Sequence, residues 1–264
     1  DWASRGGQTV GRPADASAFS SMARWLKARQ AGVTKARKAF RRKGAKGNVF
    51  LAAEVNLVLE SLRAGIPCVV DQVLPAVAVD MVSYSTYDTQ RVVPDFLAAM
   101  AFILARHHPT RASPPGAQAL IIGEFGLPQR TAPAADAQRV VGDVVNSAMK
   151  FGAALVLFWQ VYCNECSPAG QAGCSPEGRC RDPRRPISDP QRLQGFWLVR
   201  PDGSFSWPRE YLAAKLAGAP PEELARLRAE GSAAGGLSPG EAQAGADGDA
   251  LLAATVTVAA VLGA

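Results

Sequence analysis

Histidine is scarce in this sequence of 264 residues, which contains only two, His107 and His108, next to each other. Histidine is among the commonest protein ligands of transition metals, and no third histidine exists to complete a site on this pair. The sequence also has no glycine-rich turn after an early apolar run, the signature of a dinucleotide-binding domain. We therefore expect no metal site and no cofactor.

A secretion signal is also missing, since residues 1–5 (DWASR) provide neither an apolar core nor an initiating Met. We expect a chain that begins in this way to be a fragment or a processed product, so the missing signal does not identify the compartment. With 48% hydrophobic and 20% charged residues, the composition is that of a globular protein. Aromatic residues and long apolar runs fill 1–215, where we expect the ordered domain.

Charge is unevenly distributed, because the net charge of +6 comes largely from basic residues between Arg24 and Lys46. Apolar residues in the same segment have helical spacing, which predicts an amphipathic helix with a solvated basic face over 19–43. No aromatic or glycine-rich nucleic-acid motif accompanies the basic residues, so we expect no nucleic-acid partner.

Four of the five cysteines are clustered. They are Cys163, Cys166, Cys174 and Cys180. The cluster fits two disulfides or a four-thiolate zinc site, and the wide spacing of the second pair favours disulfides. Disulfides indicate a secreted or cell-surface protein. Cys68 lies in an apolar run and is expected to be a buried free thiol.

Continuous apolar runs alternate with segments of helical spacing. The expected strands cover 49–54, 77–84, 119–124 and 154–160, and the expected helices cover 19–43, 56–64, 94–107 and 134–151. Such runs are typical of strands buried on both faces, so the sequence predicts an α/β fold with a parallel sheet. We favour a partial TIM (β/α)8 barrel of about four C-terminal βα units over an open doubly wound sheet. The other barrel half would then lie upstream.

Polar and aromatic side chains close each expected strand. They are Glu54 and Asn56, then Tyr84 and Tyr87, then Glu124, and finally Trp159 and Gln160. In a barrel these strand ends meet at one rim, where carboxylates and aromatic rings suit a sugar ligand. Asn164 and Glu165 follow the last strand, and we favour loop positions over ligand contacts for them.

Three motifs resemble those of clan A glycoside hydrolases, notably the cellulase and mannanase family (family five). Residues 121–126 (IIGEFG) resemble the seventh strand, 82–87 (VSYSTY) the sixth and 157–160 (LFWQ) the eighth. The resemblance spans about 50–215 and implies hydrolysis of glycosidic bonds in an oligo- or polysaccharide. It implies Glu124 as the nucleophile, Tyr84 as its partner and Trp159 as a sugar platform. Glu54, Asn56, Tyr87 and Gln160 would also bind substrate.

One element of the family pattern is missing. The acid/base Glu of that clan closes strand four, generally as Asn-Glu, and no such strand occurs here. Asp1 and Trp2 could be the trailing edge of that motif. Glu54 is the only strand-end carboxylate that could replace it, and acid/base, sugar-binding and structural roles remain open for Glu54. A retaining mechanism needs two carboxyl groups. The alternatives are a carbohydrate-binding pseudoenzyme on the same barrel or an unrelated α/β domain.

The C-terminal part of the chain has a different composition. Residues 216–249 are rich in Ala, Gly and Pro, and we expect a linker or tail there. Residues 250–264 are uncharged and apolar, which fits a lipid-anchor signal, a truncated membrane helix or an Ala-rich helix. Membrane attachment through this segment is therefore an expectation.

Overall fold

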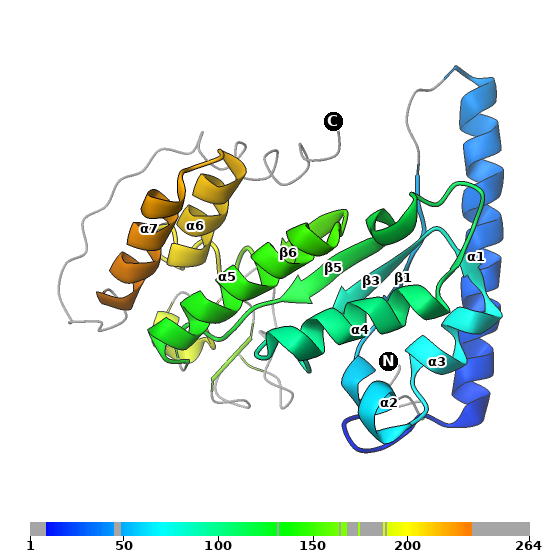
Figure 1. The fold of residues 1–264 in the computed structure, drawn as a ribbon, viewed down its shortest axis with the longest axis horizontal. Helices are drawn as coiled ribbons and strands as arrows, with labels where there is room; N and C mark the ends of the chain where they lie inside the picture. The colour runs from blue at the N-terminus through cyan, green and yellow to red at the C-terminus, as the bar shows by residue number, and fades with distance from the viewer. Residues whose placement is uncertain are drawn as a thin grey trace.

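A four-stranded parallel sheet forms the centre of the computed structural model (Figure 1). Its order is β1 (Ala52–Val55), β3 (Met81–Ser85), β5 (Leu120–Phe125) and β6 (Leu155–Phe158). The structure describes residues 9–44, 49–130, 132–163, 165–167, 174, 187 and 189–233. Because the strands follow the chain order and run parallel, the predicted α/β class with a parallel sheet is confirmed.

The helices occur where the sequence predicts them. They are α1 (Ala16–Arg42), α2 (Val58–Ala64), α4 (Val93–Arg106) and α5 (Ala134–Phe151). Shorter elements are α3 (Val69–Gln72), η2 (Leu74–Ala76), η3 (Gly116–Ala119) and η4 (Pro190–Arg192). Two helices follow the sheet: α6 (Trp207–Leu216) and α7 (Pro221–Ala233). In Figure 1, α4 and α5 lie side by side along the sheet, with α1 at one end of the molecule and α6 and α7 at the other.

The expected strand over 77–84 is interrupted at Asp80. Residues before it form β2 (Ala78–Val79), which pairs with β4 (His108–Pro109) in a separate two-stranded sheet, and β3 begins after it. The Asp80 carboxylate is fully buried and accepts hydrogen bonds from Arg37, Gln30, Thr110 and the Leu51 N–H. These contacts connect α1 to the start of the sheet.

The basic helix α1 packs through one narrow face. Phe19 and Leu26 are buried, whereas Lys27 and Lys35 are exposed, which confirms the predicted solvated basic face. Arg37 is the exception, because its buried guanidinium pairs with Asp80. Two hollows on the surface beside α1 are lined largely by residues of this helix, among them Lys35 and Lys38, and none of the residues at the carboxyl ends of the four-stranded sheet lines them.

The two faces of the sheet differ in burial. The face toward α4 and α5 carries Val82, Tyr84, Leu120 and Ile122, each 0% exposed. Alternating positions on the opposite face, among them Ile121, Leu155 and Leu157, are only partly buried. The second face is polar toward the carboxyl ends of the strands, at Ser83 and Ser85, but it also carries these apolar residues, which are not fully covered here.

The helical part of the chain extends past the boundary expected at residue 215. That position lies inside α6, and α7 occupies part of the segment expected to be a linker, where it contacts α5 and α6. The Trp207 ring stacks on Tyr211 within α6; Tyr211 is part of the core, and Trp207 packs against it. In the part of the chain that the structure describes, no helix is long and apolar enough to cross a membrane. Residues 250–264 lie outside that part.

Candidate functional site

The carboxyl ends of β1, β3 and β5 bring two glutamates to the partly open face. Tyr84 pairs with Ile122, but the register then shifts so that Ser85 pairs with Glu124. Neighbours in register on adjacent strands point to the same side of a sheet. The irregularity therefore places Glu124 on the side of Ser85, where Glu54 also lies, instead of on the helix-covered side.

Glu54 is bound to β3 through two serines. Ser85 Oγ donates to its Oε1 at 2.6 Å, and Ser83 donates a second hydrogen bond. Although the residue is exposed, the atoms around the carboxyl group exclude enough water to raise its pKa, and the two serine hydrogen bonds oppose that rise. Glu54 is therefore protonated over a wider pH range than an ordinary glutamate.

Gly123 leaves the room that this arrangement needs. A Cβ atom at this position would lie 1.9 Å from Ser83 Oγ and 3.3 Å from Glu54 Oε2. The end of β5 is similarly close to β6, since a Cβ at Gly126 would lie 2.7 Å from the Trp159 carbonyl oxygen. The glycines on both sides of Glu124 thus allow the adjoining strands to approach its backbone closely.

Tyr87 is the tyrosine that contacts Glu124. Its pKa is raised, first by burial of its hydroxyl and then by the negative charge of Glu124, with which it forms a hydrogen bond. The charges of Glu165 and Glu54 raise it further. The hydroxyl therefore stays protonated and can donate to Glu124, while 42% of the residue remains exposed at the rim.

Tyr84 occupies a different place from the one expected of a partner for Glu124. It is 0% exposed on the helix-covered side, and its ring stacks with Phe96 of α4. Its hydroxyl hydrogen-bonds to Asp88 Oδ1 at 2.9 Å and to Thr89 Oγ1 at 2.6 Å. Burial, then the Asp88 charge, raise its pKa. The alternation of β3 thus sends Tyr84 into the core, and Tyr87, three residues later, approaches Glu124.

Trp159 and Gln160 follow β6 and are both partly buried. The peptide bond between them is cis. Trp159 Nε1 donates to Glu165 Oε1 at 2.8 Å, and the Trp159 N–H donates to the Phe125 carbonyl. The Gln160 carbonyl accepts from the Leu198 N–H. Asn56 follows β1 directly and is exposed.

Glu165 is the site residue that sequence reasoning missed, since a loop position was favoured for it. Its charge raises the pKa of Tyr87 together with those of Glu124 and Glu54. The available signal was its place directly after the last strand, at the same rim as the other strand ends. Asn164, its neighbour, lies outside the described residues.

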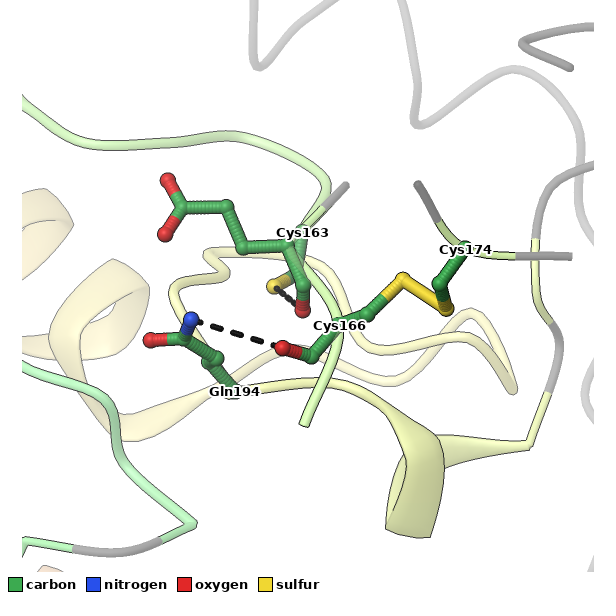
Figure 2. Close-up of a disulfide and its surroundings, with 5 residues drawn as sticks. Cys163, Cys166, Cys174 and Gln194 are labelled. Carbon is green, nitrogen blue, oxygen red and sulfur yellow. Dashed lines mark hydrogen bonds between the residues drawn. A yellow bond between two sulfur atoms is a disulfide. The ribbon is translucent and has the colours of Figure 1, made fainter. Parts of the chain in front are cut away.

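The cysteine cluster forms one disulfide among the described residues, between Cys166 and Cys174 (Figure 2). The prediction that Cys163 is cross-linked is wrong for this structure: its thiol is free and donates to the Glu165 carbonyl at 3.5 Å. Cys180 lies outside the described residues. Cys68 is a buried thiol outside any disulfide, as expected, and donates to the carbonyls of Leu57 and Ile66. The disulfide fits an oxidising, extracellular environment.

Within the described ranges, no group of three or more His, Cys, Asp or Glu side chains is arranged to hold a metal ion. His107 instead ends α4, where its Nε2 lies 2.9 Å from the Val79 carbonyl oxygen. Comparison of the chain with protein-family models, with curated proteins and with solved structures finds no match. The geometry of the strand ends is therefore the basis for a functional assignment.

Proposed function

We propose that this chain is the C-terminal half of a (β/α)8-barrel glycosidase that hydrolyses an oligo- or polysaccharide with retention of configuration. The observation that supports this most is the group formed by Glu124, Tyr87, Glu54 and Glu165 at the carboxyl ends of parallel strands. Active sites of such barrels lie at this end of the strands. The Trp159 indole at the same rim suits the apolar face of a sugar ring.

The partly open face of the sheet supports the barrel half. Ile121, Leu155 and Leu157 are apolar but only partly buried there, and a closed barrel would cover them with side chains from the missing strands. The outer strands β1 and β6 would pair with those strands. The proposal therefore explains the partly covered apolar residues of the second face, which an isolated four-stranded sheet does not.

Glu124 takes the part of the nucleophile. Its carboxylate attacks the anomeric carbon, the glycosidic C–O bond breaks, and a second carboxyl group gives its proton to the leaving oxygen. That group then takes a proton from water, which displaces Glu124 and releases the sugar. Tyr87 holds the attacking carboxylate by its hydrogen bond. Glu54, Asn56, Tyr87, Trp159 and Gln160 bind the substrate.

The proton donor is expected from strand four, upstream of β1. Glu54 is the alternative within this chain, since its raised pKa is a property that a general acid needs. In either case no metal or cofactor enters the proposed reaction. The disulfide supports a secreted or cell-surface location, and attachment to a membrane through 250–264 is part of the same proposal.

The test is the Glu124→Gln variant of the complete protein, assayed against cello- and manno-oligosaccharides. The amide keeps the size of the side chain but cannot attack, so turnover should fall by about three orders of magnitude or more while binding persists. Glu222→Gln, an exposed glutamate of α7, is the matched control and should be unchanged. Sugar binding without hydrolysis by the wild type would indicate the pseudoenzyme; neither binding nor hydrolysis would indicate an unrelated α/β domain.

A further inference from the structure

We infer that Glu165 is a positioning residue of this site: its carboxylate fixes the Trp159 indole at the rim, and the backbone of Glu165 is held by Gln194 and by the neighbouring Cys166, which is disulfide-bonded to Cys174. The inference rests on the proposed function for the meaning of the Trp159 ring as a sugar platform. The contact itself can be tested without any sugar.

The contact between the two side chains is specific in its chemistry. An indole Nε1–H is a donor that cannot accept, and a carboxylate is an acceptor. Trp159 Nε1 donates to Glu165 Oε1 at 2.8 Å, the length of a hydrogen bond to a charged acceptor. Such a bond sets the rotation of the ring and hence the face that the partly buried indole presents to a ligand.

The backbone of Glu165 is held from both sides. Its carbonyl oxygen accepts from the Gln194 N–H at 2.8 Å and from the Cys163 thiol. The next residue, Cys166, is 2% exposed, forms an antiparallel bridge with Leu193 and is bonded to Cys174 (Figure 2). Gln194 also donates to the Cys166 carbonyl. The carboxylate is thus carried by a backbone position that is held by hydrogen bonds and lies next to the disulfide-bonded Cys166.

The same carboxylate acts on the rest of the site. Its negative charge helps to keep the Tyr87 hydroxyl protonated, together with the charge of Glu124. Glu165 therefore connects two parts of the rim, the indole after β6 and the tyrosine after β3. Removing its side chain should disturb the binding surface more than the chemistry at Glu124.

The experiment compares Glu165→Ala, Glu165→Gln and the control Glu222→Ala in the complete protein. The emission of Trp159 is isolated by subtracting the spectrum of the matching Trp159→Phe protein. Glu165→Ala should shift this emission and increase its quenching by acrylamide. Glu165→Gln retains an acceptor oxygen at nearly the same size and should restore the wild-type signal.

Hydrolysis of cellohexaose or mannohexaose provides the second readout. With Glu165→Ala, KM should rise about five- to tenfold, the effect of losing one hydrogen bond, while kcat changes less than twofold. An unchanged Trp159 emission, or a loss confined to kcat, overturns the inference. A shifted emission in a protein that hydrolyses no sugar supports the positioning role and overturns the proposed function, so the two failures are distinct.

If Glu165→Ala does not fold, mild reduction of the wild type decides the matter. Opening the Cys166–Cys174 bond removes the covalent link next to Glu165 without removing the carboxylate. The Trp159 emission should then shift in the same direction as in the alanine variant, and re-oxidation should reverse it. A Trp159 emission that is the same with the disulfide open or closed overturns the part of the inference that concerns Cys166 and Cys174.

Discussion

Ser85 donates a hydrogen bond of 2.6 Å to Glu54, and in the sheet Ser85 is paired with Glu124. One serine of β3 thus lies between the strand-end glutamates of β1 and β5. The carboxyl group of Glu54 is fixed by β3 rather than by its own strand, and its distance from Glu124 depends on the register of the sheet. The candidate site is therefore sensitive to side chains that touch none of its expected ligands.

Gly123→Ala should show this sensitivity. The new Cβ would lie within 1.9 Å of Ser83 Oγ, so Ser83 and Glu54 have to move, at a cost of about 1–3 kcal/mol. Urea denaturation measures the loss. In Gly123→Ala with Ser83→Ala the closest remaining contacts are near 3.3 Å, and most of the stability should return. Equal losses in the single and double variants would show that the close approach is absent.

Replacing Tyr84 or Tyr87 by Phe should have different effects, the first on stability and the second on turnover. Tyr84→Phe removes a buried hydroxyl that bonds to Asp88 and Thr89, so stability should fall by about 1–2 kcal/mol with little change in turnover. Tyr87→Phe should leave stability within about 0.5 kcal/mol, because the residue is partly exposed, and lower turnover about tenfold. Denaturation and hydrolysis rates measured on both variants check this pair. The reverse pattern would return the role of partner to Tyr84.

Much of the fold was predictable because continuous apolar runs and helical spacing are local properties of the sequence. The strands and the helices α4 and α5 follow from them directly. The break at Asp80 was not predictable, since its partners Arg37 and Thr110 come from distant segments. Tyr87 contacts Glu124 in place of Tyr84 because of the register of β3 against β5, which the local sequence pattern does not specify.

Asp80 should make the stability of the protein depend on pH in the acidic range. Burial alone would raise its pKa, but the hydrogen bonds from Arg37, the Leu51 N–H, Thr110 and Gln30 together lower it below the ordinary value. The stabilisation by charged Asp80 is therefore complete above its pKa in the unfolded chain, about 3.9. It is lost as the pH falls through the lower pKa of Asp80 in the folded protein. Unfolding followed by circular dichroism from pH 7 downward measures this.

Asp80→Asn should cost about 3 kcal/mol at pH 7, because it leaves Arg37 charged and buried without its partner. The difference in the free energy of unfolding between Asp80→Asn and the wild type should become smaller at low pH. Asp143→Asn removes an exposed pair with Arg139 and serves as the control, with an effect below about 0.5 kcal/mol. If the loss of stability in Asp80→Asn did not change with pH, this would contradict the negative charge assigned to Asp80.

The cysteines should react in three classes. In the native, non-reduced protein iodoacetamide should modify Cys163; Cys68 should react only after unfolding, and Cys166 and Cys174 only after reduction. Peptide mass spectrometry identifies the cysteines that are modified under each condition. Replacing Cys166 and Cys174 by Ser should lower stability by about 2.5 kcal/mol, since the disulfide closes a short loop. A native bond between Cys163 and Cys180 would contradict the free thiol.

The identity of the nucleophile is the central claim, and covalent trapping tests it most directly. A 2-deoxy-2-fluoro glycoside, in gluco and manno forms, slows release of the glycosyl-enzyme so that the modified residue can be found by peptide mass spectrometry. We predict one sugar per molecule of the complete protein, on Glu124, and none in Glu124→Gln. A sugar attached to Glu54, Glu165 or any other residue, or hydrolysis without a trapped intermediate, would contradict the account.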